Sequence, residues 1–188
     1  SQPIPSDPAS AIIGGAAGIG RLAAAAMLKG LTARFLVRQT HRVRKGESVV
    51  VHAAAGGVGL IACQWLKSIG ATVIGTASSD EKCKLAKDAG ATHTINYSKE
   101  NFVERVKAIT GGKMCDVVYD SVGKDTFPAS LDCLKPLGLF VTFGNASGPV
   151  TGVDLGILGA KGSLYVTRPS LMAYTNTRAD FVETANDL

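Results

Sequence analysis

The chain has 188 residues, of which 46% are hydrophobic and 19% are charged, and its formal net charge is +5. This composition is that of a soluble globular protein, long enough for one well-buried core and short for two substantial domains. No apolar run reaches the ~18 residues that a transmembrane helix needs, and the opening SQPIPSDPAS lacks the basic and apolar regions of a signal peptide. We therefore expect a cytoplasmic protein.

Apolar and β-branched runs alternate along the chain with stretches of helical periodicity. The runs predict strands at residues 48–52, 71–76, 94–96, 116–120, 139–143 and 163–167. The helical stretches cover residues 22–38, 57–69, 79–89, 99–110 and 127–134, with a short piece near 155–158. Strands that alternate with helices in this way predict an α/β fold, a doubly wound parallel sheet of the Rossmann type in three αβα layers.

The sulfur and imidazole side chains are scattered along the sequence. The four cysteines form no CxxC pair, and we interpret them as buried free thiols: Cys63, Cys83, Cys115 and Cys133. The histidines are equally far apart: His41, His52 and His93. Because zinc sites cluster their ligands at close spacing, we expect no metal.

Much of the positive charge falls in one short region, RFLVRQTHRVRKG, which spans residues 34–46. A basic cluster is one mark of nucleic-acid binding. These charges are not interleaved with a series of aromatic stacking residues, however. We interpret the region as a solvated helix face and loop, with nucleic acid as the alternative partner.

Two glycine-rich stretches compete for the role of a dinucleotide loop. The first, IIGGAAGIG at residues 12–20, has the GxxxGxG spacing of short-chain dehydrogenases at Gly14, Gly18 and Gly20. The prolines before it make a poor central strand. In addition, no tyrosine is followed four residues later by the lysine that those enzymes need. We therefore reject the short-chain interpretation.

The second stretch, HAAAGGVG at residues 52–59, has the context that the first one lacks. It follows a predicted strand and opens a predicted helix, with Gly56 and Gly59 at the spacing of the dinucleotide fingerprint. Gly56 lets the backbone approach a pyrophosphate, and Gly59 lets helix and strand pack closely. The helix N-terminus around Gly57 and Val58 offers N–H groups to the phosphates. The alternative is a glycine-rich turn without a ligand.

The end of the next strand distinguishes NADP from NAD. NAD sites usually carry an acidic residue there for the ribose 2′-OH. This strand ends in GTASSDEK, and we place Asp80 and Glu81 at the start of the following helix. Ser78 can donate to a 2′-phosphate, and Lys82 can neutralise it. The sequence therefore predicts NADP(H); the alternative is that Lys82 only covers an exposed helix.

Several segments together carry a resemblance to a known family. They are AAAAMLKGLTA, VVVHAAAGGVGLIACQWLK, GATHTINYS, VVYDSVGKDTF, FVTFGNASGPV and GSLYVTRPSL. From about residue 22 onward, the chain closely resembles the zinc-independent quinone oxidoreductases, the zeta-crystallin-like branch of the medium-chain dehydrogenase/reductase superfamily. The resemblance implies an NADPH-dependent enzyme that reduces quinones. A related enone or alkenal reductase, and an RNA-binding or lens-structural role, are the alternatives.

The resemblance also implies which residues contact the coenzyme. Gly57 and Val58 meet the pyrophosphate, and three residues surround the 2′-phosphate: Ser78, Lys82 and Tyr97. Ser121 lies near the ribose. The nicotinamide side is approached by Phe143, Gly144, Asn145, Ala146, Ser147 and Gly148, and by Leu171, Met172 and Ala173. No catalytic acid or base stands out, which suits direct hydride or electron transfer to a quinone.

The resemblance further sets the expected domain plan. We expect residues 1–21 to be a linker or an atypical N-terminal segment and residues 22–188 to be the NADP-binding domain, with the family's GroES-like catalytic domain missing. Because the quinone packs between those two domains in the family, we expect NADPH binding with little or no turnover. The last strand, with Leu164, Tyr165 and Val166, is implied to pair edge to edge in a homodimer.

Overall fold

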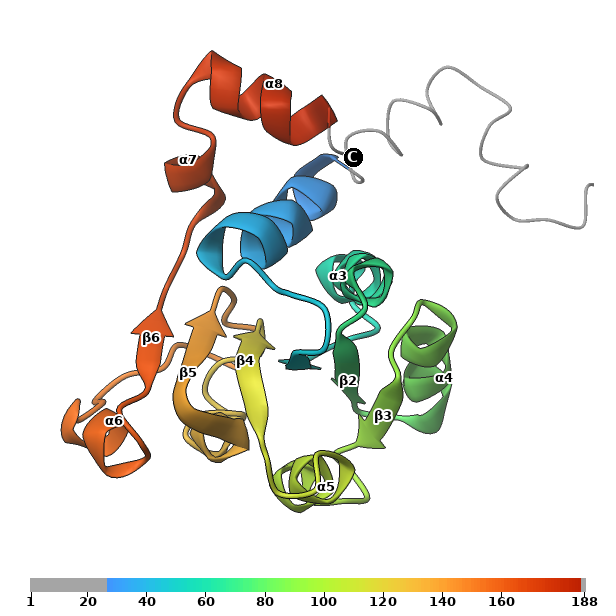
Figure 1. The fold of residues 1–188 in the computed structure, drawn as a ribbon, viewed down its shortest axis with the longest axis vertical. Coiled ribbons are helices and arrows are strands. Elements are labelled where there is room, and N and C mark those ends of the chain that lie inside the picture. The colour runs from blue at the N-terminus through green and yellow to red at the C-terminus, as the bar shows by residue number, and fades with distance from the viewer. Residues whose placement is uncertain (1–26, 187–188) are drawn as a thin grey trace, which may run out of the picture.

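The computed structural model describes residues 27–186 and builds them around a six-stranded parallel sheet (Figure 1). The strands lie in the order β3-β2-β1-β4-β5-β6. Their bounds are β1 Ser48–Val51, β2 Thr72–Ala77, β3 His93–Asn96, β4 Cys115–Asp120, β5 Leu134–Thr142 and β6 Tyr165–Thr167. The strand order reverses between β1 and β4, as in doubly wound dinucleotide-binding folds. The predicted fold class is confirmed.

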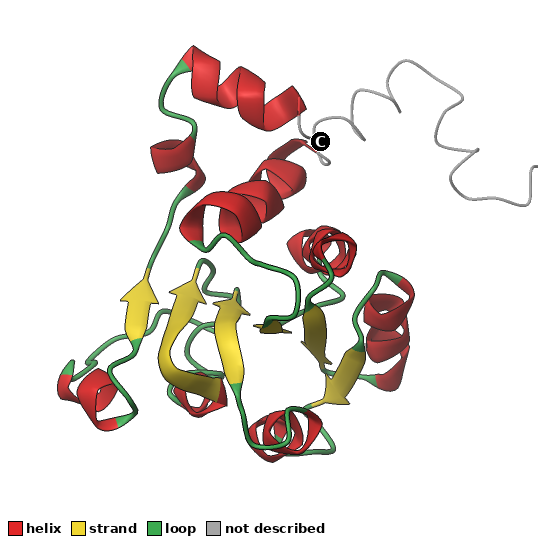
Figure 2. Ribbon diagram, in the orientation of Figure 1, coloured by secondary structure: helices red, strands yellow, loops and turns green. Residues whose placement is uncertain are grey.

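Helices cover both faces of the sheet, which Figure 2 draws in yellow among the red helices. The helices that the structure describes are the π-helix η1 Leu36–Thr40, α3 Gly57–Ile69, α4 Asp80–Asp88, α5 Phe102–Ile109, the 3-10 helix η2 Ala129–Cys133, α6 Gly156–Ala160, α7 Leu171–Tyr174 and α8 Arg178–Asn186. Residues 27–35 are also helical and run directly into η1. One face of the sheet packs against η1 and α3, the other against α5 and η2.

The central strands send side chains into both cores. In β1, Val49 and Val51 face the core under α3, whereas Val50 faces the core over α5. Val117 and Val118 of β4 divide in the same way. All five are at most 1% exposed. Because both faces of a parallel strand are covered, these strands are continuous apolar runs, the pattern from which the sequence predicts them.

Local signals set the ends of α3 and α4 where the sequence predicts them. Gly70 caps α3 in the left-handed conformation, at a φ of 86°, which glycine adopts without steric cost. Ser79 caps α4, because its side chain accepts a hydrogen bond from the backbone N–H of Lys82 at 3.3 Å. Asp80 and Glu81 therefore stand in the first turn of the helix, as expected.

The helix predicted at residues 127–134 is wrong. The structure has only the short 3-10 helix η2 there, and Leu134 already belongs to β5, where it pairs with Cys115 of β4. Pro128 disfavours helical backbone at the residue before it, so no α-helix begins at Phe127. β5 therefore contains most of the predicted strand and extends it toward the N-terminus.

Other boundaries differ by less. α5 begins at Phe102 because the side-chain oxygen of Asn101 accepts hydrogen bonds from the first backbone N–H groups of the helix, at 2.9 and 3.2 Å. The helix predicted to end at Arg38 continues through η1 to Thr40. The sequence does not predict α7 or α8. The glycine stretch at 12–20 lies outside the described residues.

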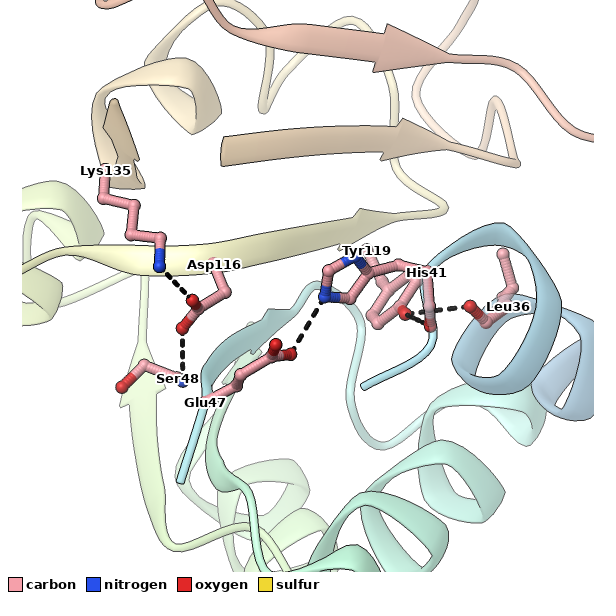
Figure 3. A network of polar contacts seen from close by, with 7 residues as sticks. All are labelled: Leu36, His41, Glu47, Ser48, Asp116, Tyr119 and Lys135. Carbon is pink, nitrogen blue, oxygen red and sulfur yellow. Dashed lines mark hydrogen bonds and ion pairs between the residues drawn. The ribbon is translucent and has the colours of Figure 1, made fainter. Parts of the chain in front are cut away.

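A buried tyrosine fastens η1 to the sheet (Figure 3). Tyr119 of β4 is 1% exposed, and its hydroxyl donates to the backbone carbonyl of Leu36 at 2.9 Å. Burial raises the pKa of Tyr119 well above its usual value, so the hydroxyl keeps the proton that it donates. In the loop that follows η1, His41 Nε2 lies 2.9 Å from Glu47 Oε2. The helix that precedes β1 is thus fixed over the centre of the sheet.

The same figure shows how the start of β1 is tied to its neighbours. Asp116 of β4 accepts a hydrogen bond from the backbone N–H of Ser48 at 2.8 Å and also pairs with Lys135 of β5. The hydrogen bond to Asp116 raises the pKa of Lys135. One carboxylate therefore joins three adjacent strands at their N-terminal ends.

The C-terminal segment returns over the helix that precedes β1, as Figure 1 shows at the red end of the chain. The rings of Phe35 and Tyr174 stack with centroids 4.6 Å apart, and the hydroxyl of Thr40 donates to the Tyr174 hydroxyl at 3.0 Å. Arg34 and Glu183 form an ion pair at 3.1 Å. These contacts hold α7 and α8 against the domain.

The four cysteines are buried free thiols, as the sequence predicts. Burial raises the pKa of Cys63 and that of Cys115 to about 12, so these thiols stay protonated at neutral pH. Within residues 27–186, no helix combines the length and the apolar character needed to cross a membrane.

Candidate functional site

In the glycine loop of residues 52–59, residues 52–56 join the end of β1 to α3, and residues 57–59 form the start of α3. Gly56 is the N-cap of α3, and a Cβ at Gly59 would come 2.5 Å from the carbonyl oxygen of Ala53 and 2.7 Å from that of Ala54. No side chain fits at such distances, so Gly59 is required for the close packing of helix and loop. The first N–H groups of α3, at Gly57 and Val58, point out of the helix end without intrahelical partners.

A groove of about 210 Å³ opens beside this loop, at the carboxyl ends of β1, β2 and β3. It is lined by Ala53, Ala55, Gly56, Ala77, Ser78, Lys82 and Tyr97. Lys82 Nζ donates to Ser78 Oγ at 3.3 Å, and Tyr97, which also lines the groove, is 42% exposed. The structure thus brings together four of the residues predicted to contact the coenzyme, Gly56 among them.

The lining of the groove contains no carboxylate. Asp80, two residues after Ser78, pairs with Lys99 at 2.5 Å and accepts from the Asn96 side chain at 2.7 Å. The hydrogen bonds from Lys99 and Asn96 lower the pKa of Asp80. The groove therefore presents an ammonium, a hydroxyl and a phenol, which together suit an anion.

Lys29 is a candidate residue that the sequence reasoning missed. Its side chain lies against Gly57, where an added Cβ would be only 2.8 Å from Nζ and 2.5 Å from Cδ. An ammonium at a helix N-terminus opposes the helix dipole unless an anion lies between them. The lysine within AAAAMLKGLTA was the available signal, but its distance along the chain from the glycine loop hid the contact.

The other predicted residues lie over the second half of the sheet. The segment after β4 and the loop 143–148 after β5 join backbone to backbone: Ala146 N–H donates to the Ser121 carbonyl at 3.1 Å, and Ser147 N–H to that of Val122 at 2.8 Å. A Cβ at Gly144 would lie 2.5 Å from the Ser121 carbonyl oxygen. Ser121 and the loop 143–148 are therefore one unit.

Three residues of α7 are predicted to lie close to the nicotinamide side, and they divide between the core and the surface. Leu171 packs against the core cluster that also contacts Phe143, whereas Met172 is 78% exposed, and Ala173 is exposed beside it. None of these residues lines the groove at Ser78. The predicted positions thus form two groups, one on each side of the point where the strand order reverses.

A second hollow, of about 310 Å³, opens beside the loop 143–148 and is mostly apolar. It is lined by Phe127, Phe140, Thr142, Asn145, Pro149, Val150, Val153, Leu155, Leu158, Val166 and Arg168. Its polar side chains all come from the ends of β5 and β6 and the loop between them.

A buried polar chain lies beneath the glycine loop. His52, 1% exposed, has Nδ1 2.8 Å from Thr76 Oγ1 and Nε2 2.9 Å from Ser130 Oγ. Thr126 donates to Asp120 at 2.7 Å, and its carbonyl accepts from Ser130 at 2.9 Å. Burial lowers the pKa of His52 to about 4, although the Asp120 charge opposes the shift. The imidazole is therefore neutral at pH 7 and joins β1, β2 and η2.

Comparison with known proteins agrees with this arrangement. The family model described as zinc-binding dehydrogenase matches residues 57–185, which begin with α3 and include the segment after β4, the loop 143–148 and the groove residues Ala77, Ser78, Lys82 and Tyr97. The chain belongs to this family. Within residues 27–186, however, no group of three or more His, Cys, Asp or Glu side chains is placed to hold a metal ion.

Individual proteins of known name also match this chain closely. A quinone oxidoreductase of Salmonella typhimurium is 63% identical over 88% of this chain and 51% of its own length. A 2-haloacrylate reductase of Burkholderia sp. is 52% identical over 84% of this chain and 47% of its own. The crystal structure of Escherichia coli quinone oxidoreductase complexed with NADPH is 58% identical, with a TM-score of 0.86, over 87% of this chain and 50% of that one.

The chain therefore spans about half the length of the relatives that it matches. The resemblance to quinone oxidoreductases drawn from the sequence motifs is confirmed by these matches.

Proposed function

We propose that this chain is the NADP(H)-binding domain of a quinone oxidoreductase that works in the cytoplasm without zinc. Relatives named quinone oxidoreductases, one of them complexed with NADPH, support the proposal. The observation that carries it is the ammonium of Lys82 beside the hydroxyl of Ser78 in a groove without a carboxylate. This pair distinguishes a coenzyme with a 2′-phosphate from one with a 2′-hydroxyl.

In this proposal the residues of the chain bind and orient the coenzyme across the end of the sheet. NADPH, when bound, supplies the hydride. The N-terminus of α3 faces the pyrophosphate, with Lys29 as a further cation. The adenosine 2′-phosphate contacts Ser78, Lys82 and Tyr97, Ser121 lies near a ribose, and the nicotinamide side is bordered by the loop 143–148 and by Leu171, Met172 and Ala173.

The decisive experiment is a titration of the chain with NADPH and with NADH, by calorimetry. Lys82→Ala is expected to weaken NADPH binding about tenfold and to leave NADH binding unchanged, because only NADPH carries the charge that Lys82 faces. Lys84→Ala is the matched control: Lys84 is on the same helix but pairs with Asp88. Equal affinity for both nucleotides, unchanged by Lys82→Ala, would contradict the assignment.

We infer a low turnover for the 188-residue chain alone. Hydride transfer requires donor and acceptor in near-attack geometry, and the relatives carry as much chain again as the part that matches here. Loss of NADPH absorbance in the presence of a benzoquinone measures the rate. A chain that reduced quinone as fast as the full-length relatives do would contradict this inference.

Reduction of an activated alkene is the second candidate, favoured by the match to the 2-haloacrylate reductase. It uses the same coenzyme residues and differs in the acceptor. NADPH oxidation measured with a benzoquinone and with 2-chloroacrylate, at matched concentrations, distinguishes the two. Faster oxidation with 2-chloroacrylate would replace the quinone as the proposed acceptor.

We further propose a homodimer that pairs through β6. Tyr165 and Val166 are 60% and 43% exposed on this strand at the edge of the sheet, an arrangement that favours pairing with another edge. Tyr165→Lys is expected to convert the dimer to monomer in sedimentation, and Leu85→Lys, on the exposed face of α4, is the control. A wild-type chain that sediments as a monomer at tens of micromolar would contradict the dimer.

A further inference from the structure

Arg168 directly follows β6, and its side chain reaches across to the loop 143–148. Nη1 donates to the backbone carbonyl of Gly144 at 3.1 Å and lies 3.4 Å from Thr142 Oγ1. In the amide orientation that satisfies both groups, Asn145 accepts from Arg168 Nη2 at 3.2 Å, and its own amide donates to the Gly144 carbonyl at 2.8 Å. One guanidinium thus contacts the end of β5 and the first residues of the loop.

These contacts hold the side of the loop 143–148 that faces β6. The opposite side is joined to the segment after β4 by the hydrogen bonds from Ala146 and Ser147. Gly144 has no side chain that could anchor it, and its Cα faces the backbone of Ser121. Among the residues that the structure describes, the Asn145 amide is the other donor to the carbonyl of Gly144. The first half of the loop therefore depends on a residue from the neighbouring edge strand.

The chemistry of the contact favours arginine over lysine. A planar guanidinium donates in two directions at once and so spans the Gly144 carbonyl and the Asn145 amide oxygen, which an ammonium cannot do in the same geometry. Among the residues that the structure describes, Arg168 makes none of the ion pairs. Its hydrogen bonds go to neutral acceptors at the end of β5 and in the loop.

The contact of Arg168 matters because of where the loop 143–148 lies. A dinucleotide lies across the carboxyl ends of the strands on both sides of the point where the strand order reverses. The groove at β2 accounts for the half that carries the 2′-phosphate, and the loop 143–148 stands beyond β4, over the other half. We propose that Arg168 is a positioning residue, which fixes this loop for the nicotinamide half of the coenzyme. The inference rests on the proposed function.

The test compares two ligands that differ in the nicotinamide half. NADPH carries both halves, whereas adenosine 2′,5′-bisphosphate carries the 2′-phosphate but no nicotinamide. In the 188-residue chain, Arg168→Ala is expected to weaken NADPH binding about fivefold, the effect of one or two lost hydrogen bonds, and to leave the bisphosphate affinity unchanged. Arg168→Lys recovers part of the NADPH affinity. Hydrogen exchange at the amides of Ala146 and Ser147 becomes faster in Arg168→Ala without any nucleotide.

Two controls separate this effect from general destabilisation. Arg44→Ala removes the same charge from an exposed loop at the opposite end of β1 and changes neither affinity. Lys82→Ala weakens both ligands, because both carry the 2′-phosphate. If Arg168→Ala weakened both ligands equally, or neither, the positioning role would be overturned while the proposed function stood. A wild-type chain that bound neither ligand would overturn both proposals.

Discussion

The two halves of the sheet present different surfaces at the same edge. Beside β1, β2 and β3, the hollow is small, about 210 Å³, and offers a lysine, a serine and a tyrosine. Beside β5 and β6, it is about 310 Å³ and mostly apolar, and Leu155 and Tyr165 nearby are 73% and 60% exposed. The first half therefore contains the ammonium and hydroxyl groups of an anion site. The second has the apolar exposure typical of a surface that another molecule contacts.

The largest expected effect is a loss of stability from a substitution at Gly59, in the half beside β1, β2 and β3. Gly59→Ala places a Cβ 2.5 Å from a backbone carbonyl that cannot move aside, so we expect it to lower the free energy of unfolding by about 3 kcal/mol. Gly159→Ala in α6, where a Cβ meets nothing within 4 Å, is the matched control in the second half. Urea unfolding followed by circular dichroism measures both. Equal midpoints for the two variants would contradict the expectation.

The next effect concerns the histidine that connects the two halves. Burial lowers the pKa of His52 to about 4, whereas the unfolded chain titrates near 6.5. Between these values the unfolded state binds a proton that the native state does not, so stability falls as the pH is lowered through this window, by up to about 3 kcal/mol. His52→Gln removes this part of the pH dependence.

Urea unfolding at about pH 7.5, above this window, and at about pH 4.5, within it, measures the difference in the free energy of unfolding. The exposed His93 of β3, replaced by Gln, is the control and is expected to keep the wild-type pH dependence. If His52→Gln lost as much stability on acidification as the wild-type chain, the buried imidazole would not be responsible.

The smallest expected effect is a loss of nucleotide affinity, and it tests whether Lys29 belongs to the anion site in the first half. Lys29→Met keeps the length of the side chain and removes its charge, and we expect it to weaken NADPH and NADH equally, by about fivefold, because both carry the pyrophosphate. Lys82→Ala, in contrast, affects NADPH alone. Lys113→Met, in the exposed loop before β4, is the control. Unchanged affinity for both nucleotides in Lys29→Met would remove Lys29 from the site.

The sequence predicts the first half more closely than the second, for reasons that particular residues show. α3 is predicted from end to end because Gly56 and Gly70 mark its termini and the strands before and after it are mainly apolar and β-branched. The helix predicted at 127–134 fails because the pairing of Leu134 with Cys115, a tertiary contact, decides the conformation there. Lys29 and Arg168 escape prediction because each acts at a loop far away in the sequence.

The packing of the loop after β4 against the loop after β5 limits how this domain can be modified. Gly123 and Gly144 each bring a Cα within reach of a facing backbone carbonyl, where an added Cβ would lie 2.4 and 2.5 Å away. At these two glycines no side chain fits between the loops, so substitutions there are expected to disrupt the packing of the two loops. Substitutions are better accommodated in the neighbouring segment at 149–155, which is mostly exposed and follows the packed loop directly.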